Sequence, residues 1–156
     1  MNREERVRAA VEGRQPDRVP VSVWMHISDK DQDPRSLAEA MVEFNEKYDY
    51  DFIKMMPFGA YTVPDWGAKL DVYCDRYKEV EIAASGISSR EDYKCIEPLP
   101  AIYGTWGKVL QLSRWLERLA KPGTPYIQTR FSPATTLKKL AGNRMLQDRL
   151  ECPELV

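Results

Sequence analysis

The chain has 156 residues, with 23 Lys and Arg against 24 Asp and Glu, so its formal net charge is -1. This balance lacks the basic excess of a nucleic-acid binder, and 43% hydrophobic residues suffice for the core of one globular domain. No apolar run approaches the roughly 20 residues of a membrane-spanning helix and no secretory segment follows the charged start, which predicts a cytoplasmic protein that contacts neither nucleic acid nor membrane.

The N-terminal stretch predicts a short helix followed by a strand. The apolar positions within residues 2–13 fall on one side of a helix, which Gly13 can end. Residues 19–25 are mostly β-branched or bulky apolar residues, interrupted by Ser22. Such a run is typical of a buried strand in a parallel sheet, and we expect the first strand here.

A second helix and a second strand follow. Asp33 as N-cap and Pro34 at the first helical position are a typical helix start, and an apolar stripe at helical spacing runs from Leu37 to Tyr48. Phe52–Met56 is a short apolar run that predicts the second strand. Strand, helix and strand in this order form a βαβ unit, whose strands are parallel.

Residues 58–100 are less regular than the segments before them. Alternating apolar residues near positions 72–73 and again near 80–82 are typical of a hairpin. We interpret residues 58–100 as an irregular insertion after the second strand.

The remaining residues return to the βα pattern. Apolar spacing predicts a helix over residues 106–120 and a third strand over 126–131. Ser132 with Pro133 repeats the cap-plus-proline helix start, and a further short helix is expected over 143–150.

Three cysteines and one histidine limit the metal and redox chemistry of the chain. Cys74, Cys95 and Cys152 are far apart and odd in number, which favours neither a disulfide framework nor a zinc knuckle. His26 is the single histidine, and a zinc site usually needs three or four ligands. We therefore expect no metal site in this chain.

The order of elements predicts an α/β fold in a single domain over residues 1–156. Three βα units build either an open doubly wound sheet or part of a (β/α)8 barrel of the TIM type. A dinucleotide-binding open sheet should carry Gly-x-Gly-x-x-Gly after its first strand, and residues 24–34 contain no glycine. A partial barrel of about three βα units, with an insertion after the second strand, is therefore the favoured architecture.

Four stretches of the chain carry its most specific patterns. They are RVRAAVEGRQPDRVPV, YDYDFIKMMP, GISSREDYKCIEPLP and TPYIQTRFSPATTLKKLAG. Together they resemble the amino-terminal half of the uroporphyrinogen decarboxylase family. The resemblance implies a (β/α)8 barrel with its site at the carboxyl ends of the strands. It also implies one of two activities: removal of acetate carboxyl groups from a tetrapyrrole, or transfer of methyl groups between a corrinoid or other carrier and a thiol.

The chain departs from the pattern of the decarboxylase subgroup of that family. That subgroup carries two arginines after its first strand, where Met25–Lys30 has none. It also carries an aspartate after the second strand, where no carboxylate occurs between Asp51 and Asp65. The resemblance therefore implies the N-terminal portion of a corrinoid- or thiol-dependent methyltransferase-like enzyme. The alternatives are a tetrapyrrole decarboxylase, or a non-catalytic half-barrel for binding or assembly.

The site residues expected from the barrel geometry lie at the strand ends. His26 and Lys54 are the candidate catalytic residues, although a hydrogen-bonded strand-end histidine and a salt-bridged lysine are open alternatives. Arg130 beside the helix start at Ser132 is suited to an anionic group, and its alternative role is pairing with a carboxylate. The candidate substrate-binding residues are Trp24, Met25, Met56, Phe58, Tyr61, Arg130 and Ser132.

The same reasoning predicts the partners of the chain. We expect a small-molecule substrate, such as a tetrapyrrole, a corrinoid or a methyl donor. No cofactor is expected within this chain, and a corrinoid or zinc would belong to a full-length barrel, so we expect the chain alone to be inactive. Because open parallel strand edges tend to find another chain, we also expect a homo-oligomer or a complementary second half, unless the chain is a truncated piece of a longer enzyme.

Overall fold

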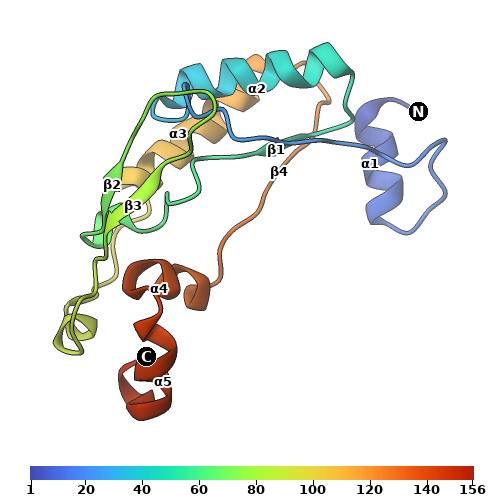
Figure 1. Ribbon diagram of the computed structural model, residues 1–156. Helices are drawn as coiled ribbons and strands as arrows, with labels where there is room; N and C mark the ends of the chain where they lie inside the picture. Colours follow the sequence, from blue (N-terminus) through green and yellow to red (C-terminus); the bar gives the residue numbers. More distant parts are fainter.

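The computed structural model describes residues 1–156 as a mixture of helices and short strands (Figure 1). The elements are α1 (Arg3–Val11), α2 (Pro34–Tyr48), β1 (Ile53–Met55), η1 (Pro64–Trp66), β2 (Lys69–Asp71), β3 (Glu81–Ala84), η2 (Glu91–Cys95), α3 (Gly104–Leu119), β4 (Tyr126–Gln128), α4 (Pro133–Ala141), α5 (Arg144–Glu151) and η3 (Pro153–Leu155). The predicted α/β class is confirmed. No helix is both long enough and apolar enough to span a bilayer.

The strands form two separate two-stranded sheets. β1 and β4 are parallel, with Lys54 opposite Ile127, which confirms the second and third predicted strands and their direction. β2 and β3 are antiparallel and form the hairpin expected inside the insertion. The structure contains no closed barrel.

The prediction of a buried first strand is wrong. Residues 21–27 have no regular secondary structure, and Val19, Val21 and Val23 are 75%, 49% and 50% exposed. The segment makes one backbone hydrogen bond to the β1 region, from the Asp51 N–H to the Val21 carbonyl, at 2.9 Å. One such bond does not make a ladder, and no chain covers the outer side of the segment, so its apolar residues stay exposed.

The segment of residues 19–27 nevertheless lies beside β1, on the side opposite β4. The Ser22 hydroxyl donates to the Phe52 carbonyl at 2.7 Å, and the Ile53 N–H donates to the Pro125 carbonyl at 2.9 Å. The Phe52 carbonyl and the Ile53 N–H belong to one trans peptide unit and therefore point in opposite directions. The lateral order is thus the 19–27 segment, β1 and β4.

Helices α2 and α3 lie side by side along β1 and β4 (Figure 1) and contribute most of the helical part of the core. The Asp33 side chain accepts a hydrogen bond from the Ser36 N–H at 2.7 Å, so the predicted cap of α2 is confirmed. Buried side chains at helical spacing face the strands. They include Leu37, Met41, Val109, Leu112 and Leu116, whereas Tyr48, the last residue of the predicted stripe, is 51% exposed.

Candidate functional site

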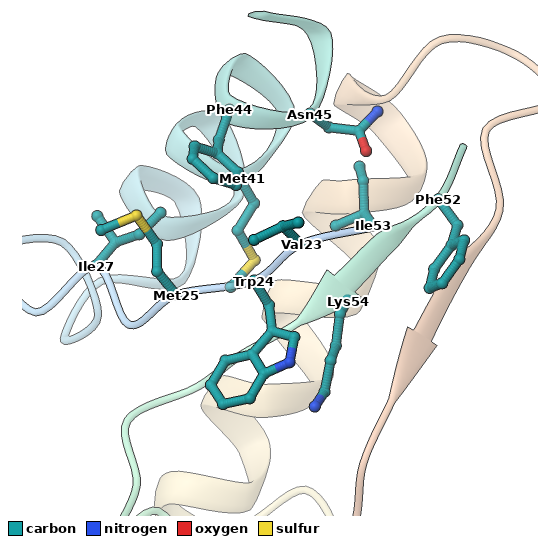
Figure 2. A pocket seen from close by; sticks show the side chains of 10 residues that line it. All are labelled: Val23, Trp24, Met25, Ile27, Met41, Phe44, Asn45, Phe52, Ile53 and Lys54. Carbon is teal, nitrogen blue, oxygen red and sulfur yellow. The ribbon is translucent and has the colours of Figure 1, made fainter. Parts of the chain in front are cut away.

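Trp24 and Lys54 form the centre of the candidate site. The Lys54 ammonium lies 4.1 Å from the centroid of the Trp24 ring, within the range of a cation–π interaction. Figure 2 shows both side chains pointing the same way, whereas Met41 and Phe44 belong to α2 on the other side of the strand segment. Lys54 forms no ion pair, and 48% of the Trp24 side chain is exposed. An indole face and an ammonium group are therefore presented together at an open surface.

His26 extends this surface toward the hairpin. Its ring meets the Trp24 ring edge-on, with the centroids 6.1 Å apart and the planes at 83°. His26 Nε2 lies 3.9 Å from Glu79 Oε2, which lies within the insertion just before β3. The insertion thus reaches back to the loop after residues 19–25, beside the imidazole.

Met25 lies on the opposite side of its segment from Trp24. It packs near Ile27, Met41 and Phe44 around a cavity of about 20 Å³, which has room for about one water molecule (Figure 2). Met25 is thus placed toward α2 and away from the Trp24 and Lys54 surface.

Phe58 and Tyr61 lie in the hydrophobic core. Tyr61 is 2% exposed and stacks on Phe131 at 5.6 Å between centroids, with Trp106 edge-on at 5.3 Å. Burial raises the pKa of the Tyr61 phenol, although the Phe131 backbone, Arg130 and Gln128 act against that shift. Met56 is half-buried against the same core. Phe58 and Tyr61 are therefore part of the hydrophobic core, and Met56 packs against it.

Arg130 and Ser132 sit at the junction of β4 and α4. The Arg130 guanidinium carbon lies 5.7 Å from the centroid of the Trp106 ring, and Arg130 forms no salt bridge. The Ser132 hydroxyl accepts from the Thr135 N–H at 3.1 Å and caps α4. The pairing of Arg130 with a carboxylate, left open by the sequence, does not occur within the chain.

Asp31 is a buried carboxylate that the sequence did not single out. One oxygen accepts from the Gln32 amide at 2.7 Å, and the other has no hydrogen-bond partner. Burial raises its pKa, although Gln32 and His26 act in the opposite direction. In the sequence it stands between Asp29 and Asp33 in a polar loop, and nothing in that pattern distinguishes it from its exposed neighbours.

The site contains no cluster of metal ligands. No group of three or more His, Cys, Asp or Glu side chains lies close enough together to hold a metal ion. The three cysteines are free, with Cys74 and Cys95 exposed. The chemistry available at the Trp24 surface is therefore stacking, cation contact and hydrogen bonding.

A comparison with solved structures places this geometry in a known fold. The chain is similar to a methyltransferase from Methanosarcina mazei, with a TM-score of 0.75 and 13% sequence identity. The match covers 99% of this chain and 50% of that chain, so the chain spans half the length of its structural neighbour. No protein-family model matches the sequence, and neither does any curated protein. At this identity the likeness shows the fold alone.

Proposed function

We propose that this chain is the amino-terminal half of a methyl-transferring barrel related to the uroporphyrinogen decarboxylase family. The observation that carries the proposal is the pairing of Trp24 with Lys54 at an open surface, in a chain whose fold matches half of a methyltransferase. The parallel β1 and β4, with α3 between them in sequence, are what a partial (β/α)8 barrel requires.

The ligand suited to this surface is a flat molecule with polar edges, such as a corrinoid. The Trp24 ring, which is 48% exposed, can stack on a flat ring system, and Lys54, which lacks an acidic partner, can meet a carbonyl or anionic group at the periphery of that ring system. A bound corrinoid would supply the methyl group, whereas the residues of this chain would orient it and exclude water on one side. Zinc does not fit this chain, because it has no ligand cluster.

Tetrapyrrole decarboxylation receives less support from the same surface. The arginines and the aspartate of that subgroup have no counterparts after residues 19–25 or after β1. Lys54 alone offers one cation to a substrate with several carboxylates. Methyl transfer is therefore the function that we favour.

The proposal is tested by titrating the purified chain with hydroxocobalamin and, in parallel, with a carboxylated porphyrin. We expect cobalamin binding, and an affinity about fivefold weaker for Trp24→Ala because a stacked ring pair contributes roughly 1 kcal/mol. Trp115→Phe is the matched control, since Trp115 lies on α3 between Arg35 and Arg118 and away from Lys54. Absence of cobalamin binding, or equal affinity in Trp24→Ala, would refute the proposal. Tighter porphyrin binding would favour the decarboxylase alternative.

A further inference from the structure

His26 is the one histidine of the chain, and neither nitrogen of its ring has a hydrogen-bond partner. The side chain is 16% exposed, and its nitrogens are not among the buried polar atoms that lack a partner. The ring is therefore held within the fold while its nitrogens stay accessible to a ligand. A neutral imidazole nitrogen is the commonest metal ligand in proteins.

A bare metal ion does not suit this imidazole. A metal ion bound by protein alone usually needs three or four side chains, and the chain has no such group. A metal ion at the centre of a flat macrocycle is different, because the macrocycle supplies the ligands in its own plane and the protein adds an axial one. His26 is thus suited to a metal that arrives within a macrocycle, such as the corrinoid proposed above.

The rings of Trp24 and His26 are oriented as such a complex requires. Their planes stand at 83° to each other, and their centroids are 6.1 Å apart. A macrocycle stacked on the Trp24 face lies parallel to the indole, and so nearly perpendicular to the imidazole. Because the nitrogen lone pair lies in the imidazole plane, an axial imidazole must also stand perpendicular to the macrocycle. The observed angle meets this condition.

Glu79 can supply the second interaction that a metal-binding histidine usually makes. Such a histidine donates its other ring N–H to a carboxylate or carbonyl, which fixes the ring and raises the basicity of the ligating nitrogen. Glu79 Oε2 faces His26 Nε2 at 3.9 Å, and the Glu79 side chain is 63% exposed and has no other ion pair. A small movement of Glu79 lets it accept from Nε2, which leaves Nδ1 for the metal.

We propose that His26 is the axial ligand of the cobalt ion in a corrinoid bound at the Trp24 surface. The neutral imidazole donates the Nδ1 lone pair to cobalt and takes the position otherwise held by water or by the corrinoid's own base, so no electron or proton is transferred. Trp24 contacts the face of the macrocycle, and Lys54 contacts its polar rim. The inference rests on the proposed function, because it names the residue of that same site that meets the metal.

Electron paramagnetic resonance of cobalt(II) tests the inference. The chain, purified without a histidine tag, is mixed with hydroxocobalamin and reduced to the cobalt(II) form. An axial nitrogen of the ordinary isotope splits the cobalt lines into triplets, and one of the heavy isotope splits them into doublets. Since the chain has one histidine, labelled histidine in the growth medium marks His26 alone. We expect triplets from the unlabelled chain and doublets from the labelled one.

The other spectra separate this inference from the proposed function. Triplets that persist with the labelled chain would show that bound cobalamin keeps its own base, and lines without nitrogen splitting would show that no nitrogen is coordinated. Either result, with cobalamin bound, would overturn the role of His26 and leave the proposed function standing. A chain that binds no cobalamin would overturn both.

Binding by variants tests Glu79 as the positioning residue. We expect Glu79→Gln to bind cobalamin about tenfold more weakly, because loss of a carboxylate behind a metal-binding histidine has effects of this size, and to keep the doublets of the labelled chain. Glu91→Gln is the matched control, since Glu91 is an exposed glutamate of the same insertion without an ion pair. His26→Ala should bind at least as weakly as Glu79→Gln. Equal affinity in His26→Ala and the wild type would overturn the inference, and equal affinity in the two glutamate variants would overturn the role of Glu79.

Discussion

Arg18 and Asp51 form a two-point ion pair, with Arg18 Nη1 2.5 Å from Asp51 Oδ2 and Nη2 2.8 Å from Oδ1. Arg6 donates to the same carboxylate at 2.6 Å, and the Val21 N–H donates to it at 2.7 Å. The Asp51 side chain is 1% exposed. Burial favours a higher pKa for Asp51, but the bonds from Arg18, Val21 and Arg6 outweigh it and hold the pKa below its usual range. One carboxylate therefore joins α1, the start of the 19–27 segment and the residues before β1.

Replacing Asp51 with alanine should destabilise the chain strongly. The change leaves Arg6 largely buried without one of its two carboxylate partners and removes four hydrogen bonds, so we expect a loss of about 3 kcal/mol in the free energy of unfolding. Urea denaturation measures it. Asp71→Ala, on the exposed strand β2, serves as the control and should change the free energy of unfolding by less than about 0.5 kcal/mol. Similar values for the two variants would show that the Asp51 network contributes nothing.

This network also shows what the sequence could and could not predict. The stretch from Arg6 to Pro20 is part of the family resemblance, and the structure gives Arg6 and Arg18 a shared partner in Asp51. That partner is more than 30 residues away from both, so no local pattern indicated it. Helix starts such as Asp33–Pro34 were predictable, because capping depends on neighbouring residues.

The first strand was not predictable in the same way. The apolar pattern depends only on residues 19–25 themselves. Burial depends on other elements that pack against these residues, and within the chain Val19, Val21 and Val23 stay exposed. The pairing of Trp24 with Lys54 was likewise hidden, because it depends on how the 19–27 segment crosses β1. The sequence singled out both residues as site candidates, and the structure brings them together.

Gly104 should not tolerate a side chain. It starts α3 at φ +48°, and a methyl group there would overlap the Asp65 carboxylate, which accepts hydrogen bonds from the Thr105 N–H at 2.9 Å and 3.1 Å. We expect Gly104→Ala to lower the free energy of unfolding by about 2 kcal/mol, through backbone strain and loss of this cap. Gly59→Ala is the control, because a methyl group at Gly59 meets no atom within 4 Å. Equal thermal midpoints for the two variants would contradict the expected strain.

Leu116 should be among the residues on which the core depends most. It is 0% exposed on α3, whereas Leu150 on α5 is 85% exposed. Truncating a buried leucine removes its transfer free energy and leaves a cavity, so Leu116→Ala should cost about 3 kcal/mol. Leu150→Ala should cost less than about 0.5 kcal/mol. Chemical denaturation of both variants gives the comparison, and a small effect at Leu116 would mean that α3 is not held by the core.

Acid should weaken the attachment of α5 to η2. Hydrogen bonds from Arg144 and Arg90 lower the pKa of Asp148 to about 2 from its usual 3.8, and Tyr93 donates a third bond at 3.1 Å. Because the folded pKa lies below the unfolded one, the stabilisation is complete above the unfolded pKa and is lost as the pH falls from about 4 toward 2. Thermal midpoints measured across this window should fall with pH in the wild type. In Asp148→Asn they should start lower and fall less steeply, because the asparagine cannot titrate. An equally steep fall in both proteins would assign the acid sensitivity to other carboxylates, of which Asp51 is the first to test.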